Sequence, residues 1–375
     1  MCDIICFNVV TIITAKVINM KKLTLTNNNI KPVGRTYYFE DALWSAFSGT
    51  GAEFDFEGKT LYVTLLADKS ADEEAKENVA RYGVYVNGER VCEGTLNERV
   101  TKLTVINSEQ PVKARVQIIK LSECAMSTMG IDSLETDDDA SITPAPVRER
   151  KIEFIGDSIT CGYGVDDEDP LHHFKTSTED CTAAYAYKAA RALDADYSLV
   201  SISGYGIISG YTGTAEEKIT DQLVPPYYPT LGFSYKSFAD KLAPEDIPWD
   251  FKQFVPQAIV INLGTNDDSY CLDHEDRQRD YADNYKIFLK VVREKNPDAF
   301  IFCGVGIMGT RIYKALEMAV NEYKAETGDE RVLAHCFKEH DAEKDGLVAD
   351  YHPIRKSHDN ACAEIAPIIK DTMGW

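Results

Sequence analysis

The feature that most constrains the fold of this chain is a change of pattern near residue 150. Before it, from about residue 22 to residue 121, short strand-like runs are separated by turn residues, with hardly any helical periodicity. After it, apolar strand-like runs alternate with helical patterns. Alternating strands and helices imply a parallel sheet covered by helices on both faces. The pattern therefore predicts an all-β domain followed by an α/β domain.

The N-terminal domain is expected to be a β-sandwich or jelly roll. Asn87-Gly88 lies between strand-like runs at 82–86 and 90–92 and predicts a hairpin, because both residues tolerate positive φ. Glu57 and Gly58 are expected to form a second turn, between strands at 54–56 and 60–66. Further strands are expected at 100–106 and 112–121, and the charged segment 67–79 is expected to be a solvated loop or a short surface helix.

Four segments are expected along the chain. Residues 1–19 are apolar, but they carry Asp3 and lack the basic start and the cleavage site of a signal peptide, so we interpret them as an extension outside the fold, with Met20 as the natural start. Residues 20–132 form the β domain, and residues 151–375 form the α/β domain. Between them, residues 133–150 combine an acidic run with two prolines, which predicts a linker.

Five buried parallel strands are expected in the C-terminal domain, at 152–155, 197–202, 258–263, 300–305 and 332–336. Helical patterns lie between them, at 183–193, around 281–292 and at 312–323, where Gly328 closes the last one. Open parallel sheets of this kind bind their ligands at the carboxyl ends of the strands. Those ends are therefore where we look for functional residues.

Polar residues and glycines follow three of these strands and occupy the last loop. Ser158 follows the first strand where a helix would begin, which places its hydroxyl and its own N–H at a positive helix terminus. Gly204 follows the second strand, Asn266 the third, and His352 lies in the loop after the fifth. Each feature has a simpler interpretation, since Ser and Asp are favoured helix caps and Gly-Thr-Asn or His-Pro are common in turns.

Together these residues form a set that acyl transfer requires. Ser158 would be the nucleophile and His352 the general base, while the N–H groups of Ser158 and Gly204 and the amide of Asn266 would form an oxyanion hole. This chemistry requires neither a metal nor a cofactor. Thr160 stands where a G-x-S-x-G elbow would need glycine, which argues against the α/β-hydrolase arrangement.

The same residues resemble the sequence blocks of the SGNH (GDSL) hydrolases: Gly156-Asp157-Ser158, Gly204, the run 264–267 and the segment 350–352. The longer runs GDSITCGYG, VSISG, WDF and VINLGTND, together with an N-terminal β domain, are similar to carbohydrate esterase family 2. The resemblance implies a jelly-roll domain joined to a three-layer α/β/α esterase domain with a five-stranded parallel sheet. It also implies metal-free deacetylation of O-acetylated plant-wall sugars.

One position departs from the pattern of that family. Many SGNH enzymes have an acid three residues before the histidine, but here that residue is Ala349, and Asp350 stands two residues before His352. Asp350 is therefore a candidate for the orienting acid. The resembled family also includes members in which a backbone carbonyl orients the histidine, so a dyad and a triad are both compatible with the sequence.

Several other residues have two interpretations. Asp157 is expected to be a cap or loop anchor and not an acid or base, and Cys161 a packing residue and not a nucleophile. His358 could anchor its loop or line the site, and the structural role is favoured. His172 and His173 could suggest a metal site, but adjacent histidines do not readily bind one ion, so an exposed loop is favoured. The aromatic residues between strands two and three would either stack on sugars or form a small core of their own: Tyr205, Tyr211, Tyr227, Tyr228, Phe233 and Tyr235.

The composition of the chain argues against some classes of binding partner. A formal net charge of -21 argues against nucleic acid and anionic membranes as partners, because both would repel the chain. No run approaches the length of a membrane span, and ten scattered cysteines without a CxxC motif indicate free thiols in a reducing compartment, so we expect a cytoplasmic protein. The expected activity is O-deacetylation of acetylated xylo-, manno- or gluco-oligosaccharides. The alternatives are a short-chain lipase or thioesterase of the same fold and a non-catalytic glycan-binding protein.

Overall fold

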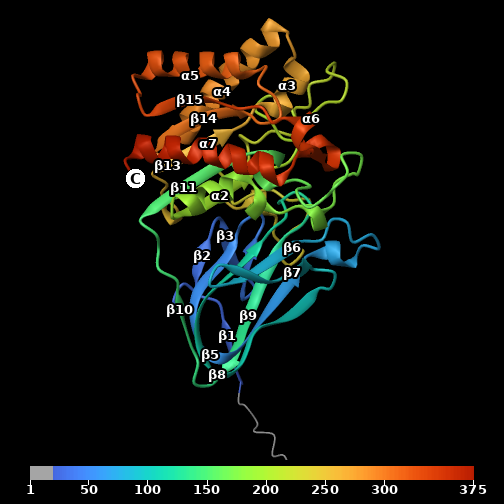
Figure 1. Cartoon of the computed structure of the whole chain (residues 1–375), viewed down its shortest axis with the longest axis vertical. Coiled ribbons are helices and arrows are strands. Elements are labelled where there is room, and N and C mark those ends of the chain that lie inside the picture. The colour runs from blue at the N-terminus through green and yellow to red at the C-terminus, as the bar shows by residue number, and fades with distance from the viewer. Residues whose placement is uncertain (1–19) are drawn as a thin grey trace, which may run out of the picture.

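The computed structural model describes residues 20–375, so the extension expected at 1–19 lies outside the described residues. Figure 1 shows the two halves of the chain stacked along the long axis, with the β domain below and the α/β domain above. The first is antiparallel, and the second contains a five-stranded parallel sheet. The change of pattern near residue 150 thus corresponds to a real change of architecture, and the expected fold class is confirmed.

The β domain has ten strands in one hydrogen-bonded sheet. The main order is β3-β4-β9-β5-β8-β6-β7, and β1, β2 and β10 pair with β9 or β5 outside this path. The strands are β1 (Met20–Thr24), β2 (Lys31–Val33), β3 (Thr36–Phe39), β4 (Ala42–Ser45), β5 (Gly51–Ala67), β6 (Arg81–Val86), β7 (Glu89–Thr95), β8 (Val100–Lys120), β9 (Met129–Asp137) and β10 (Ser141–Pro144).

The predicted hairpin is present, but the second predicted turn is wrong. Asn87 and Gly88 join β6 to β7 with φ values of 54° and 89°, as the dipeptide predicts. Glu57 and Gly58 instead lie inside the continuous strand β5, whose pairing with β8 shifts register between Gly58 and Thr60. A bulge bends a strand without ending it, and in sequence it resembles a turn.

The predicted linker at 133–150 is also largely wrong. Residues 133–137 complete β9, which pairs with β1 and β5, and β10 pairs antiparallel with β5. Five residues, 145–149, therefore separate the last strand of the β domain from β11. The acidic and proline-containing sequence is compatible with these short pairings because part of it faces solvent.

The parallel sheet of the α/β domain has the order β12-β11-β13-β14-β15. Its strands are β11 (Arg150–Gly156), β12 (Ala195–Ser201), β13 (Ala258–Asn262), β14 (Phe300–Gly306) and β15 (Val332–Phe337). The helices are α1 (Ser158–Cys161), α2 (Tyr185–Ala192), α3 (Thr265–Cys271), α4 (Glu275–Lys295), α5 (Tyr313–Thr327), α6 (Ala342–Asp345) and α7 (Arg355–Met373). A two-residue pairing joins β16 (Leu347–Val348) to β17 (His352–Pro353).

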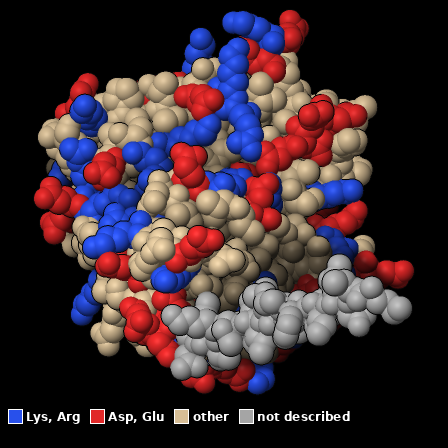
Figure 2. Space-filling view, turned by 60° about the horizontal axis from the view of Figure 1, so that its bottom comes forward, with Lys and Arg blue, Asp and Glu red and all other residues tan. Residues whose placement is uncertain are grey.

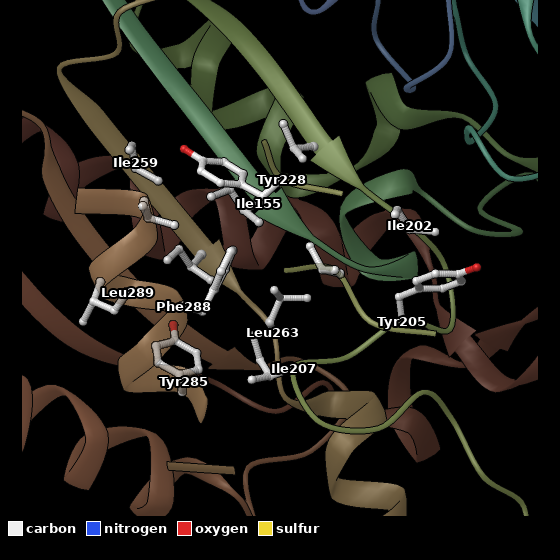
Figure 3. Packing of buried hydrophobic residues seen from close by; sticks show 14 of the residues in the cluster. Ile155, Ile202, Tyr205, Ile207, Tyr228, Ile259, Leu263, Tyr285, Phe288 and Leu289 are labelled. Atoms are coloured by element: carbon white, nitrogen blue, oxygen red, sulfur yellow. The ribbon is translucent and has the colours of Figure 1, made fainter. Parts of the chain in front are cut away.

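Helices cover both faces of the parallel sheet because its strands are apolar on both sides. Figure 3 shows one face, where Ile155, Ile259 and Leu263 meet side chains of α4 such as Phe288 and Leu289. On the other face, side chains such as those of Phe154, Val260 and Phe302 pack against α2 and α7. Successive residues of a strand point to opposite faces, so continuous apolar strands require two layers of helix.

The two domains share their hydrophobic cores. Trp44 and Phe47 of the β domain pack in the same cluster as α4 and α5, whereas Ile119 and Leu121 join the cluster of α2 and α7. A buried ion pair crosses the boundary, with Arg35 Nη2 3.3 Å from Glu153 Oε2 on β11. The β domain therefore helps to support the parallel sheet.

Charges of both signs are interspersed over the face seen in Figure 2. Within residues 20–375, no helix is long and apolar enough to span a membrane. All eight cysteines of that part are free thiols, and five of them are buried.

Candidate active site

Three strand ends converge because of the register of the parallel sheet. Gly156 at the end of β11 pairs with Ser201 of β12 on one side and with Asn262 of β13 on the other. The chain leaves these three neighbours in the same direction, so the turns that follow them lie together. Ser158, Gly204 and Asn266 come two, three and four residues after this row. The structure thus groups the three residues that the sequence singled out.

Ser158 begins the one-turn helix α1. Asp157 is its N-cap, and the Asp157 carboxylate accepts the Ile159 N–H at 3.0 Å, as the sequence predicted. The side chain of Ser158 is largely buried, with 6% of its surface exposed. The first N–H groups of a helix have no acceptor within the helix. Among residues 20–375, the Ser158 N–H therefore donates to no protein group and lies beside the residue's own hydroxyl.

His352 makes the direct contact with this hydroxyl. Its Nε2 lies 2.9 Å from Ser158 Oγ, although 194 residues separate the two in sequence. Its Nδ1 faces two backbone carbonyls, of Ala349 at 3.2 Å and Asp350 at 3.1 Å. Carbonyl oxygens only accept, so Nδ1 carries the hydrogen and Nε2 is free to accept the serine proton.

The Asp350 carboxylate is not the orienting acid. It accepts the Tyr163 hydroxyl at 2.8 Å and the Phe174 N–H at 2.9 Å, and it lies 3.2 Å from His173 Nδ1. Asp350 has a left-handed φ of 48°, which turns its carbonyl, and not its side chain, toward His352. The expectation of a third side chain at this position is therefore corrected to a backbone acceptor.

Tyr163 was not predicted to be part of the site. Its ring stacks on the His352 ring with centroids 4.0 Å apart, and the Phe174 ring also stacks on Tyr163, at 4.4 Å. The hydrogen bond to Asp350 fixes the tyrosine in this position. In the sequence, its position five residues after Ser158 and just beyond the one-turn helix was the available signal.

Gly204 and Asn266 follow β12 and β13, the two strands that flank β11, where oxyanion donors are expected. Gly204 has a φ of 80°, which favours glycine, and a Cβ added there would meet no atom within 4 Å, so this residue borders open space. Within residues 20–375, the Gly204 N–H donates to no protein group. The Asn266 amide donates to the Tyr205 carbonyl at 2.9 Å and lies 3.5 Å from Asp157 Oδ2, a distance at which a hydrogen bond is weak.

The carboxylate of Asp267 shapes the loop after β12. It accepts the N–H groups of Ile207, Ile208 and Ser209 at 2.7 to 3.1 Å. Burial raises the pKa of Asp267 to about 6 in spite of these hydrogen bonds. Burial likewise raises the pKa of Asp157 to about 7, and the charge of Asp267 adds to this effect.

Burial also sets the charge of His352. It lowers the pKa of this histidine to about 4, although the carbonyls of Asp350 and Ala349 oppose the shift. The imidazole is therefore neutral at neutral pH, which is the form that can accept a proton.

The remaining candidates lie apart from the reacting atoms. Cys161 is buried against Ser201 Oγ at 3.2 Å, and burial raises the pKa of its thiol. His358 is buried in α7, where its Nδ1 lies 3.4 Å from the Tyr185 N–H. His172 and His173 are exposed and contact Asp167 and Asp350. Among residues 20–375, no three His, Cys, Asp or Glu side chains are grouped as a metal site would require.

The aromatic residues after β12 divide between the two interpretations. Tyr228 is fully buried and donates to Glu153 at 2.9 Å, so it belongs to the core. Tyr205, Tyr227 and Phe233 pack together at 4.6 to 6.1 Å, and Tyr235, 59% exposed, packs edge-on against Phe233. Tyr235 and the exposed Tyr211 remain available to a ligand.

The sequence is similar to known families and proteins. Residues 154–361 match the family described as GDSL-like Lipase/Acylhydrolase family, and residues 32–146 match Carbohydrate esterase 2 N-terminal. Cellulase/esterase CelE of Acetivibrio thermocellus is 28% identical over 334 residues, and these cover 88% of this chain but only 38% of that protein. Acetylxylan esterase / glucomannan deacetylase of Cellvibrio japonicus is 26% identical, over 94% of this chain and 91% of the relative.

Solved structures show the same similarity. An acetyl xylan esterase from the rumen bacterium Butyrivibrio proteoclasticus superposes with a TM-score of 0.85 at 25% identity, covering 95% of this chain and 99% of the other. A family two carbohydrate esterase from Clostridium thermocellum, in complex with cellohexaose, superposes with a TM-score of 0.77 at 27% identity, covering 92% and 99%.

Proposed function

Because the chain belongs to the GDSL-like lipase/acylhydrolase family and carries the N-terminal domain of carbohydrate esterase family 2, we propose that it removes acetyl groups from acetylated xylo-, manno- or gluco-oligosaccharides. The observation that carries this proposal is the 2.9 Å contact between His352 Nε2 and Ser158 Oγ, with Nδ1 held by carbonyls. The relatives named as acetylxylan esterase and glucomannan deacetylase support the substrate class.

The proposed reaction uses the residues in the following order. His352 accepts the proton of Ser158, whose oxygen attacks the acetyl carbonyl. The negative oxygen that forms would receive hydrogen bonds from the free N–H groups of Ser158 and Gly204 and from the Asn266 amide. His352 then gives its proton to the departing sugar oxygen. Water, activated by the same histidine, releases acetate from the acetyl-serine.

The direct test is Ser158→Ala with 4-nitrophenyl acetate and with a mixture of acetylated oligosaccharides. We expect loss of at least ~10³-fold in kcat, as for removal of a nucleophile, with an unchanged unfolding temperature. NMR of the wild-type reaction would identify the sugar and the position that is deacetylated. Retention of most activity in the variant would refute the role of Ser158.

A second candidate function is non-catalytic binding of glucan chains in the same site. It is favoured by the structure of the Clostridium thermocellum relative, which is in complex with cellohexaose. Isothermal titration of Ser158→Ala with cellohexaose tests it. Binding without turnover of any acetylated glycan by the wild type would favour this second function over the first.

A further inference from the structure

The loop that carries Gly204 is held on one side by its own domain. Asn266 and Asp267 of α3 bind the carbonyl of residue 205 and the N–H groups of 207–209. On its other side, the Ser203 N–H donates to Glu123 Oε2 at 3.0 Å. Glu123 lies between β8 and β9, so this contact comes from the β domain.

Glu123 is itself fixed by a chain of hydrogen bonds. Its backbone N–H donates to Glu179 Oε2 at 2.6 Å. Lys120 Nζ donates to the carbonyls of Ser122, at 2.8 Å, and of Glu123, which holds the turn that presents the glutamate. The neighbouring Cys124 Sγ lies 3.5 Å from the carbonyl of Ser201 at the end of β12. The order of contacts therefore runs from Glu179 through Glu123 to Ser203, directly before Gly204.

This cluster is not explained by stability alone. Lys120, Glu123 and Glu179 are all at most 1% exposed, and Glu179 Oε1 has no hydrogen-bond partner among the described residues. Burial raises the pKa of both carboxyls, and the charge of Glu123 raises that of Glu179 further. Burial of ionisable groups costs free energy unless they are fully paired, and apolar residues of similar volume often stabilise a core more.

We propose that Glu123 is a positioning residue supplied by the β domain: its carboxylate holds the Ser203 N–H and so directs the Gly204 N–H at the oxyanion. This inference rests on the proposed esterase function. It assigns to the β domain a part in the reaction that acts through Gly204, an oxyanion donor carried by the other domain.

The test compares three substitutions at one position. Glu123→Gln keeps an oxygen that can accept the Ser203 N–H. Glu123→Asp keeps the charge but withdraws the oxygens by one methylene, and Glu123→Ala removes the acceptor. Asp68→Ala is the matched control, because Asp68 is also a buried acid of the β domain that accepts backbone N–H groups, of Ser70 and Thr128, away from the Gly204 loop.

Kinetics with 4-nitrophenyl acetate, normalised by active-site titration, give the first readout. Direct loss of an oxyanion donor lowers kcat by about 10² to 10³, so we expect a loss of roughly tenfold to a hundredfold for Glu123→Ala and about tenfold for Glu123→Asp, with KM changed less than about threefold. Glu123→Gln should restore kcat to within about threefold of wild type, since its bond to Ser203 is retained. Asp68→Ala should lower the unfolding temperature and leave kcat unchanged.

Methylboronic acid gives the second readout, because its tetrahedral adduct with serine places an oxygen in the oxyanion hole without a sugar. Its inhibition constant should weaken in Glu123→Ala by the same factor as kcat/KM. Equal kcat and equal boronate inhibition in wild type and in both Glu123→Ala and Glu123→Asp would overturn the inference. Turnover of the aryl acetate without any deacetylation of glycans would overturn the proposed function only, and the comparison at Glu123 would still decide this inference.

Discussion

At the scale of single residues, the orientation of the general base His352 depends on backbone atoms. The Nδ1 hydrogen of His352 points to the carbonyls of Ala349 and Asp350, and the ring is held flat against Tyr163. A carboxylate in this position would raise the pKa of the histidine through its charge. Carbonyl groups raise the pKa of the histidine less. The effect of burial is therefore the larger one, and it lowers the pKa of His352 to about 4.

This lowered pKa gives a pH prediction. The neutral form of His352 is active, so its protonation should abolish kcat/KM only near pH 4, whereas protonation of Asp267, with a pKa of about 6, should cause only a partial loss before that. The sign follows because protonation removes the acceptor for the serine proton. A pH profile of 4-nitrophenyl acetate hydrolysis, over a range in which the protein stays folded, would measure this. A complete loss of activity with a midpoint near pH 6.5 would contradict the effect of burial on the pKa of His352.

Tyr163 should matter through its ring more than through its hydroxyl. Tyr163→Ala removes the surface on which His352 rests, and we expect kcat/KM to fall by about tenfold or more, since small misplacements of a base are costly. Tyr163→Phe keeps the stack and loses only the bond to Asp350, so the loss should be a few-fold. Kinetics of both variants, with His352→Ala as the reference, provide the test. Equal losses of kcat/KM in the two variants would show that the Tyr163 hydroxyl, and not its ring, supports the histidine.

At the scale of elements, the site is a set of strand ends whose loops are tied to one another. Asp267, on α3, gathers three N–H groups of the loop after β12. Hydrogen bonds to a charged group contribute about 1.5 to 3 kcal/mol. The position of Gly204 therefore depends on a side chain of α3, the helix that follows β13, the next strand of the parallel sheet along the chain.

Asp267→Asn should disturb this loop, because the new amide brings hydrogens toward N–H groups. We expect a lower unfolding temperature and a fall of roughly tenfold in kcat/KM, as one oxyanion donor shifts. Asp268→Asn is the matched control, since its carboxylate pairs with Arg311 near the surface, at 2.8 Å, and such pairs contribute about 0 to 1 kcal/mol. The unfolding temperature and kcat/KM should both be lower in Asp267→Asn than in Asp268→Asn, and thermal unfolding and kinetics of the two variants test this.

The elements also show what the sequence could predict. The five parallel strands and the residues that follow them were predicted because buried parallel strands are continuous apolar runs bounded by Gly, Ser and Asn. The turn at Glu57-Gly58 was not, because a bulge within a strand and a turn use the same residues. Asp350 was uncertain for a related reason, since the left-handed backbone that decides which of its atoms faces His352 has no clear signal in the sequence.

At the scale of the whole molecule, the two domains depend on each other. Arg35 donates to Glu153 and to the carbonyls of Tyr228 and Thr230, and it lies 5.1 to 5.3 Å from three aromatic rings. This contact is fully buried and crosses the boundary between the domains. The β domain was recognisable in the sequence, but long-range contacts of this kind were not, because they join residues 118 positions apart.

Arg35→Met should therefore destabilise the protein without changing its chemistry. Removal of one partner leaves Glu153 buried and unpaired in charge, which costs about 3 to 5 kcal/mol. Glu153 is not one of the groups that act on the substrate and lies five residues before Ser158. We therefore expect kcat per titrated site to be unchanged. Arg99→Met removes the more exposed contact to Asp240, also between the domains, and should cost about 0 to 1 kcal/mol. Denaturant unfolding of both variants would test this; equal costs would contradict the difference in burial.

The left-handed backbone at Asp350 and Tyr351, with φ of 48° and 63°, has a consequence for how this catalytic centre tolerates mutation. A main-chain acceptor has no side chain that alanine could remove, so of the three groups that handle the serine proton an alanine scan would reveal only Ser158 and His352. Saturation mutagenesis at position 350 should instead sort substitutions by shape. Asn and Gly, which adopt positive φ readily, should keep the histidine oriented, whereas Val and Ile should not. The third member of this centre is thus a backbone conformation and not a side chain.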